Sequence, residues 1–90
     1  VRGGGPKRVS AANSSLSLPP LGKTDVIRWR AKDGREVEGL VTYPVGYEKG
    51  KRYPLILNIH GGPAGAFGES FIGAASLYPI ATFAAKGWVT

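Results

Sequence analysis

The sequence predicts an α/β fold, because three patterns follow one another along the chain. Two short runs alternate apolar and polar residues on either side of an Asp-Gly pair, which is typical of an antiparallel hairpin. A short run at residues 55–59, Leu-Ile-Leu-Asn-Ile, lacks alternation and is mainly apolar, which is typical of a strand covered on both faces of a parallel sheet. A Gly-rich loop and a segment with helical spacing come next, as at the start of a doubly wound sheet.

The hairpin is predicted from residue 24 onward. Ile27, Trp29 and Ala31 alternate with arginines, so a period of two places these apolar side chains on one face of a strand. Asp33 and Gly34 both tolerate positive φ and supply a tight turn. Apolar residues and glycine alternate again in the second strand, at Val37, Gly39, Val41 and Tyr43, before Pro44 ends it.

A helix is predicted over residues 76–86, where apolar residues recur every three or four positions. Pro79 suits its first turn and Gly87 suits its C-terminal cap. The last three residues, 88–90, are typical of the beginning of another strand. Near the start of the chain, residues 6–10 predict a short strand after a Gly-rich turn, and a polar connector extends to about residue 20.

The composition excludes several classes of site. The chain has no cysteine, which excludes disulfides and thiolate metal sites, and its single histidine has no second histidine with which to hold a metal. We therefore expect no metal and no cofactor. The uncharged stretch at residues 71–85 has fifteen residues and contains a proline, whereas a membrane span needs roughly 20. No membrane partner is expected, and the compartment and the oligomeric state stay open.

The net charge of +6 lies mainly in the first third of the chain. Residues 1–30 carry six Lys or Arg against Asp25 alone. Clustered basic residues commonly contact phosphate, but no aromatic residue lies near the basic residues at positions 2–8 to stack on bases. We therefore expect no nucleic-acid partner.

The four residues His60-Gly61-Gly62-Pro63 follow the predicted buried strand directly. Ligands of a doubly wound sheet sit beyond the carboxyl ends of its central strands, where this loop falls. In acyl transfer the substrate's carbonyl oxygen gains negative charge, and backbone N–H groups fixed in advance stabilise it. A His-Gly-Gly loop after the third strand of an α/β-hydrolase is a usual source of one such donor. Gly62 is our first choice of donor, with Gly61 shaping the turn and His60 and Pro63 ordering the loop; the alternative is a sharp turn without chemistry.

No catalytic triad is predicted within these 90 residues. His60 comes before any nucleophile elbow, whereas the histidine of an α/β-hydrolase comes last in the chain. Ser70 is not a candidate nucleophile, because its Gly-x-Ser run lacks the final glycine. Asp25 and Asp33 lie in or beside the hairpin, away from any position that could orient a histidine.

The combination of motifs resembles the prolyl oligopeptidase family of serine peptidases, over about residues 24–90. In chain order the motifs are Val26-Ile27-Arg28-Trp29, Asp33-Gly34, Val37-Glu38-Gly39, Tyr43-Pro44, Tyr53-Pro54-Leu55-Ile56-Leu57 and His60-Gly61-Gly62-Pro63. Members with this loop are similar to acylaminoacyl-peptidases and bacterial dipeptidyl peptidases. In those proteins a β-propeller precedes the hydrolase domain and restricts substrates to short peptides.

The resemblance implies that the chain is a fragment of an α/β-hydrolase fold. Residues 1–20 would be the last strand of a β-propeller and a linker, and residues 21–90 the N-terminal part of the peptidase domain. Gly62 would give its N–H to the oxyanion hole; some relatives use a tyrosine hydroxyl from the position that His60 occupies here.

The family's catalytic Ser, Asp and His would lie beyond Thr90, so the resemblance also implies that these 90 residues alone are inactive. The fourth strand of the implied fold sits between the second and third. An isolated chain that ends where this strand begins should therefore be poorly folded.

Two other functions stay open from the sequence. A carboxylesterase or lipase shares the His-Gly-Gly signal. A small basic module could instead use the glycine loop to cradle a phosphate or RNA, although no Gly-Lys-Ser or Gly-Lys-Thr follows the loop.

Overall fold

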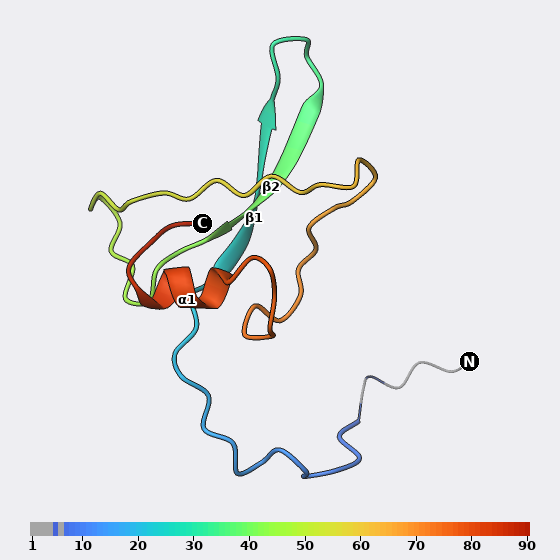
Figure 1. Ribbon diagram of the computed structural model, residues 1–90, viewed down its shortest axis with the longest axis vertical. Coiled ribbons are helices and arrows are strands. Elements are labelled where there is room, and N and C mark those ends of the chain that lie inside the picture. The colour runs from blue at the N-terminus through green and yellow to red at the C-terminus, as the bar shows by residue number, and fades with distance from the viewer. Residues whose placement is uncertain (1–4, 6) are drawn as a thin grey trace.

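The computed structural model describes Gly5 and residues 7–90. In this part of the chain the elements are strand β1 (Thr24–Arg30), strand β2 (Glu36–Thr42) and helix α1 (Ile80–Ala85). The two strands form a hairpin that projects from the remainder of the chain, with α1 near its base (Figure 1). A short turn connects the two strands, whereas a long segment without helix or strand, residues 43–79, connects β2 to α1.

The hairpin has the register that the alternation predicts. β1 and β2 pair antiparallel, with Ile27 opposite Gly39 and Trp29 opposite Val37, so these apolar residues share one face. A Cβ at Gly39 would lie 3.2 Å from the Trp29 ring, so the glycine leaves room for the indole. The predicted strands and their common apolar face are confirmed.

The turn of the hairpin is longer than predicted. Asp33 does not adopt positive φ; only Gly34 does, at 85°. The Gly34 N–H donates to the Ala31 carbonyl at 2.9 Å, and the Ala31 N–H donates to the Arg35 carbonyl at 2.9 Å. The connection is therefore a three-residue loop with glycine in the left-handed position, and the prediction of a tight two-residue Asp-Gly turn was wrong. The Asp33 side chain accepts a hydrogen bond from the Arg35 N–H instead.

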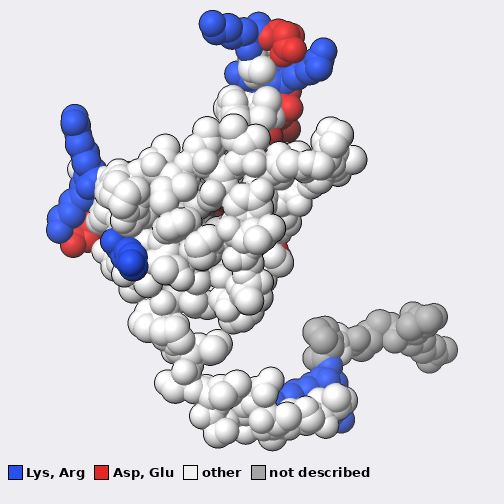
Figure 2. All heavy atoms as spheres, in the orientation of Figure 1, with Lys and Arg blue, Asp and Glu red and all other residues white. Residues whose placement is uncertain are grey.

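Charged side chains of both signs gather at the free end of the hairpin (Figure 2). Arg28 pairs with Glu38 across the strands, and Arg35 pairs with Asp33 at 3.2 Å. These side chains are all more than half exposed, so each pair contributes about 0–1 kcal/mol. Arg28 and Arg35 thus have acidic partners, and charges of both signs are mixed at this end of the hairpin.

The last residues of the chain join the hairpin to the apolar segment at 55–59. Thr90 exchanges two backbone hydrogen bonds with Thr42 at the end of β2, at 2.8 and 3.0 Å. Val89 forms a parallel bridge with Leu55, in which its N–H donates to the Pro54 carbonyl at 2.9 Å. The predicted start of a strand at residues 88–90 is present only as the bridge at Val89 and the pairing of Thr90 with Thr42, between β2 and residues 54–56.

The predicted central parallel strand is reduced to this single bridge, so the prediction of a strand over residues 55–59 was wrong in extent. The side chains of Leu57 and Ile59 are each 77% exposed, although a strand covered on both faces was expected. The physical reason is the lack of partners, because among the described residues only Val89 pairs with this segment, whereas Thr90 pairs with Thr42. Backbone groups beyond Ile56 have no neighbouring strand in the described chain.

Helix α1 is shorter than the predicted range of 76–86. Pro79 is its N-cap residue, with ψ of 62°, and does not lie in the first turn. Proline disfavours helical geometry in the residue before it, which keeps the predicted residues 76–78 out of the helix. At the other end Gly87 adopts φ of 85°, as expected for a residue that follows a helix.

The core of the described chain is small. Ala84 of α1 is fully buried, and the Val45 N–H donates to its carbonyl at 3.0 Å, which holds the helix beside the end of β2. A Cβ at Gly22 would lie 2.8 Å from the Ala84 Cβ and still closer to the Tyr43 carbonyl. Glycine at position 22 therefore allows the chain to pass between the hairpin and the helix.

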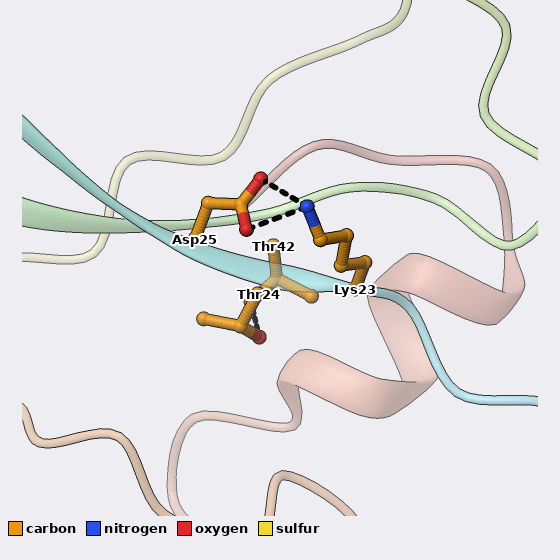
Figure 3. Close-up of polar contacts among 4 residues, drawn as sticks. All are labelled: Lys23, Thr24, Asp25 and Thr42. Atoms are coloured by element: carbon orange, nitrogen blue, oxygen red, sulfur yellow. Dashed lines mark hydrogen bonds and ion pairs between the residues drawn. The ribbon is translucent and has the colours of Figure 1, made fainter.

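Polar contacts tie the base of the hairpin together (Figure 3). The Thr24 and Thr42 hydroxyls share a hydrogen bond of 2.8 Å across the strands. The Lys23 ammonium lies 2.8 Å from an Asp25 carboxylate oxygen, and this hydrogen-bonded carboxylate raises the pKa of Lys23 above its ordinary value. Because this ion pair is exposed, it adds little to stability.

The N-terminal segment contains neither helix nor strand between residues 7 and 23. The predicted strand at 6–10 is thus absent from its described part, residues 7–10, whereas Pro6 and residues 1–4 of the predicted Gly-rich turn lie outside the described residues. An isolated propeller strand would have no neighbours with which to pair. Among the described helices, none has the length and apolar character to cross a membrane.

Candidate functional site

The His60–Pro63 loop directly follows the segment that pairs with Val89. The loop lies at the carboxyl end of this segment because it follows the segment in the chain, and the segment's pairing is the parallel bridge at Leu55. All four residues of the loop are exposed. The loop is therefore open to a ligand from outside.

Gly62 has a conformation that other residues rarely adopt. Its φ is 69°, and no atom lies within 4 Å of the position a Cβ would take. Its carbonyl oxygen accepts hydrogen bonds from the N–H groups of Ala64 and Gly65, the latter at 3.1 Å. Within the described residues, the N–H groups of Gly61 and Gly62 donate to no backbone carbonyl. The turn thus engages the Gly62 oxygen and leaves its N–H free for a ligand.

His60 contacts the loop and an aromatic cluster. Its Nδ1 atom lies 3.4 Å from the Gly61 oxygen, to which it donates when it carries the proton. Its ring meets the Phe67 ring edge-on at 6.0 Å, and Phe67 meets Tyr78 in the same way at 5.2 Å. An aromatic pair such as Phe67 and Tyr78 contributes about 0.5–1.5 kcal/mol beyond the burial of its area. The predicted loop-ordering role of His60 is compatible with these contacts and stays a prediction.

A groove of about 840 Å³ lies beside the loop. One wall is the apolar face of the hairpin with Ile27 and Trp29, and the other contains residues 55–60 and the aromatic side chains that follow the loop. The Asn58 Nδ2 atom is buried here and has no hydrogen-bond partner among the described residues. The walls are mainly apolar, so the groove suits a hydrophobic segment of chain.

The structure does not bring together a nucleophile, a base and an acid. The hydrogen bond of the His60 ring goes to a backbone oxygen, and in the described chain no carboxylate or hydroxyl forms a hydrogen bond with the ring. The Ser70 N–H donates to the Gly68 carbonyl at 2.8 Å in an exposed bend, which is not the strained strand-to-helix turn of a nucleophile. Over Gly5 and residues 7–90, no cluster of three metal-ligating side chains occurs.

Sequence reasoning missed the residues that surround the loop. Gly65, Phe67 and Tyr78 contact His60 or Gly61, directly or through one another, but were not singled out. A signal was present, because a third glycine lies three residues after the Gly-Gly pair and an aromatic residue follows two residues later. Neither the glycine nor the aromatic residue indicates from sequence which atoms it contacts, because these contacts form only when the loop folds back on itself.

Comparison with known proteins identifies relatives over most of the chain. The probable dipeptidyl-peptidase 5 of Emericella nidulans is 38% identical over 82 residues, which are 90% of this chain and 11% of that protein. The dipeptidyl-peptidase 5 of Aspergillus fumigatus is 33% identical over 67 residues, or 72% of this chain and 9% of that protein. The uncharacterized peptidase YuxL of Bacillus subtilis is 32% identical over 88 residues, or 91% of this chain and 12% of that protein.

These relatives are much longer than the chain, which spans about a tenth of their length. No family model matches the chain, and no solved structure matches it significantly. The likeness nevertheless covers the hairpin, the apolar segment and the glycine loop in relatives from fungi and from a bacterium. The chain is therefore a distant homologue of dipeptidyl-peptidase 5 and of the peptidase YuxL, and its resemblance to the prolyl oligopeptidase family of serine peptidases is confirmed.

Proposed function

We propose that this chain is part of a longer serine peptidase, the full-length protein, which hydrolyses short peptides through an acyl-enzyme. In this proposal residues 21–90 begin the α/β-hydrolase catalytic domain, and residues 1–20 are the last propeller strand and the linker. The Gly62 N–H belongs to the oxyanion hole, with Gly61 shaping the turn and His60 and Pro63 ordering it. The relatives' names support a peptide substrate.

The chemistry assigns one task to this loop. A serine hydroxyl encoded after Thr90 loses its proton to a histidine and attacks the carbonyl carbon of the substrate. The electron pair of the C=O bond moves onto oxygen, and the Gly62 N–H donates to that oxyanion. Collapse of the intermediate expels the amine, which takes the proton from the histidine, and water then releases the acid from the serine.

One observation carries the proposal: the two glycine N–H groups are exposed and unused by the backbone of the described chain. They lie at the carboxyl end of a segment that pairs parallel with Val89, where ligands of such sheets bind. Exposed N–H groups without a backbone acceptor are what an oxyanion donor requires. The basic-module alternative gains no support from the mixed charges of the hairpin (Figure 2).

The full-length protein is expected to release 4-nitroaniline from dipeptidyl 4-nitroanilides and to lose this activity after reaction with a fluorophosphonate, which labels a catalytic serine. The carboxylesterase alternative is tested with 4-nitrophenyl butyrate in parallel. An esterase would cleave the ester and leave the amides intact, which would refute the peptidase assignment. RNA binding that weakens with salt, without hydrolysis of either substrate, would instead favour the phosphate-binding module.

A further inference from the structure

We infer that Gly65 is a positioning residue that sets the direction of the Gly62 N–H, an inference that rests on the proposed oxyanion role of Gly62. A Cβ built on Gly65 would lie 2.6 Å from the Gly61 oxygen and 3.3 Å from the His60 Nδ1 atom. Contacts of a Cβ below about 3.0 Å essentially do not occur, so an alanine at position 65 displaces the Gly61 carbonyl.

The Gly61 carbonyl and the Gly62 N–H belong to the same peptide group. Because that group is planar, its oxygen and its N–H turn together about the axis between the two Cα atoms. Displacing the Gly61 oxygen therefore swings the Gly62 N–H away from its original direction. The close approach at position 65 therefore affects the direction of the Gly62 N–H, three residues earlier in the chain.

A backbone hydrogen bond within the turn holds Gly65 in place. Its N–H donates to the Gly62 carbonyl at 3.1 Å, so residues 62–65 close on themselves. Its φ is not in the left-handed region, so an alanine would suffer from the close approach and not from backbone strain. The effect of a methyl group at this position is therefore local to the Gly61–Gly62 peptide.

Gly68 supplies a matched control within the same exposed loop. No atom lies within 4 Å of its Cβ position, and its φ is also ordinary. Gly68→Ala adds the same methyl group three residues away from Gly65 and touches nothing. Any general effect of alanine on the loop should appear in both variants.

The experiment compares Gly65→Ala and Gly68→Ala in the full-length protein. For Gly65→Ala we expect kcat on a dipeptidyl 4-nitroanilide to fall roughly tenfold to a hundredfold, because misplacement of a catalytic group by about 1 Å has effects of this size. KM should change by less than about twofold, since an oxyanion donor acts mainly in the transition state. Affinity for a peptide aldehyde, which forms a tetrahedral adduct with serine, should fall by the same factor as kcat. Gly68→Ala should match the unaltered protein in all three.

Rates are expressed per active site titrated with a fluorophosphonate, so unfolded molecules do not count. If Gly65→Ala does not accumulate as folded protein, His60→Ala serves as the second variant. It removes the 3.4 Å contact to the Gly61 oxygen and should lower kcat and aldehyde affinity together. Equal kcat values for Gly65→Ala and Gly68→Ala would overturn the inference, as would a change confined to KM. Removing the Gly62 N–H itself tests the proposed function separately: if that change slows catalysis while Gly65→Ala does not, only the positioning role fails.

Discussion

Replacement of the Gly62 amide by an ester is expected to slow peptide hydrolysis by the full-length protein roughly a hundred- to a thousandfold. Glycolic acid at this position removes the N–H and keeps the φ of 69° accessible, so the turn retains its shape. The lost donor corresponds to about 2.7–4 kcal/mol of transition-state stabilisation. The loss should appear in kcat measured with a dipeptidyl 4-nitroanilide, with KM nearly unchanged.

Two further esters serve as controls for this substitution. An ester at Gly68 lies in the same exposed loop and should leave kcat within about twofold of the unaltered protein. An ester at Gly61 separates the two candidate donors, because the N–H groups of both glycines are free in the described chain. A large loss at Gly61 with none at Gly62 would move the donor by one residue. No loss at either position would remove the oxyanion role from this loop.

The 90-residue chain on its own is expected to show no cooperative thermal unfolding. Its radius of gyration is 16.6 Å, compared with about 12 Å for a compact domain of this length. Ala84 is the one fully buried apolar residue among those described, and Leu55, Leu57 and Ile59 are each at least 66% exposed. A hairpin and one short helix bury too little apolar area to offset the conformational entropy of ordering the chain.

Scanning calorimetry and near-ultraviolet circular dichroism of Trp29 and Trp88 test this expectation, with the full-length protein as the reference. Ala84→Asp, which would place a charge in a packed core, should leave the spectra of the short chain unchanged. The matched variant Ala85→Asp changes an exposed position on the same helix. A sharp heat-absorption peak for the 90 residues, abolished by Ala84→Asp and retained by Ala85→Asp, would contradict the expectation.

The hairpin could be predicted from the sequence because its determinants are local. Alternation at Ile27 and Trp29 fixes which side chains share a face, and a shift of one residue would expose them on the wrong side. The turn was predicted one residue too short, because the pairing of Ala31 with Arg35 depends on where the ladder ends and not on the Asp-Gly pair alone.

The central strand and the helix were less predictable because both depend on neighbours. Residues 55–59 have the composition of a buried strand, but backbone hydrogen bonds need a partner, and in the described chain only Val89 provides one. The predicted helix began too early because proline is acceptable both in the first turn and at the N-cap. In the structure Pro79 has a ψ of 62° and is the N-cap residue.

The glycine loop shows the same difference between features set by local sequence and features that depend on folded contacts. Gly62 could be singled out because a His-Gly-Gly run after an apolar strand carries a chemical meaning by itself. Gly65 could not, since its importance arises from a 2.6 Å approach to the Gly61 oxygen that exists only once residues 62–65 close into a turn. The spacing of the glycines marks position 65 but does not say which atoms it approaches.

A crystal structure of the full-length protein with a peptide aldehyde bound to its serine tests the central claim most directly. The hemiacetal oxygen should lie about 2.7–3.1 Å from the Gly62 nitrogen, the range of an oxyanion-hole hydrogen bond. An adduct whose oxygen is held by other groups, with the Gly62 nitrogen beyond hydrogen-bonding distance, would contradict the account.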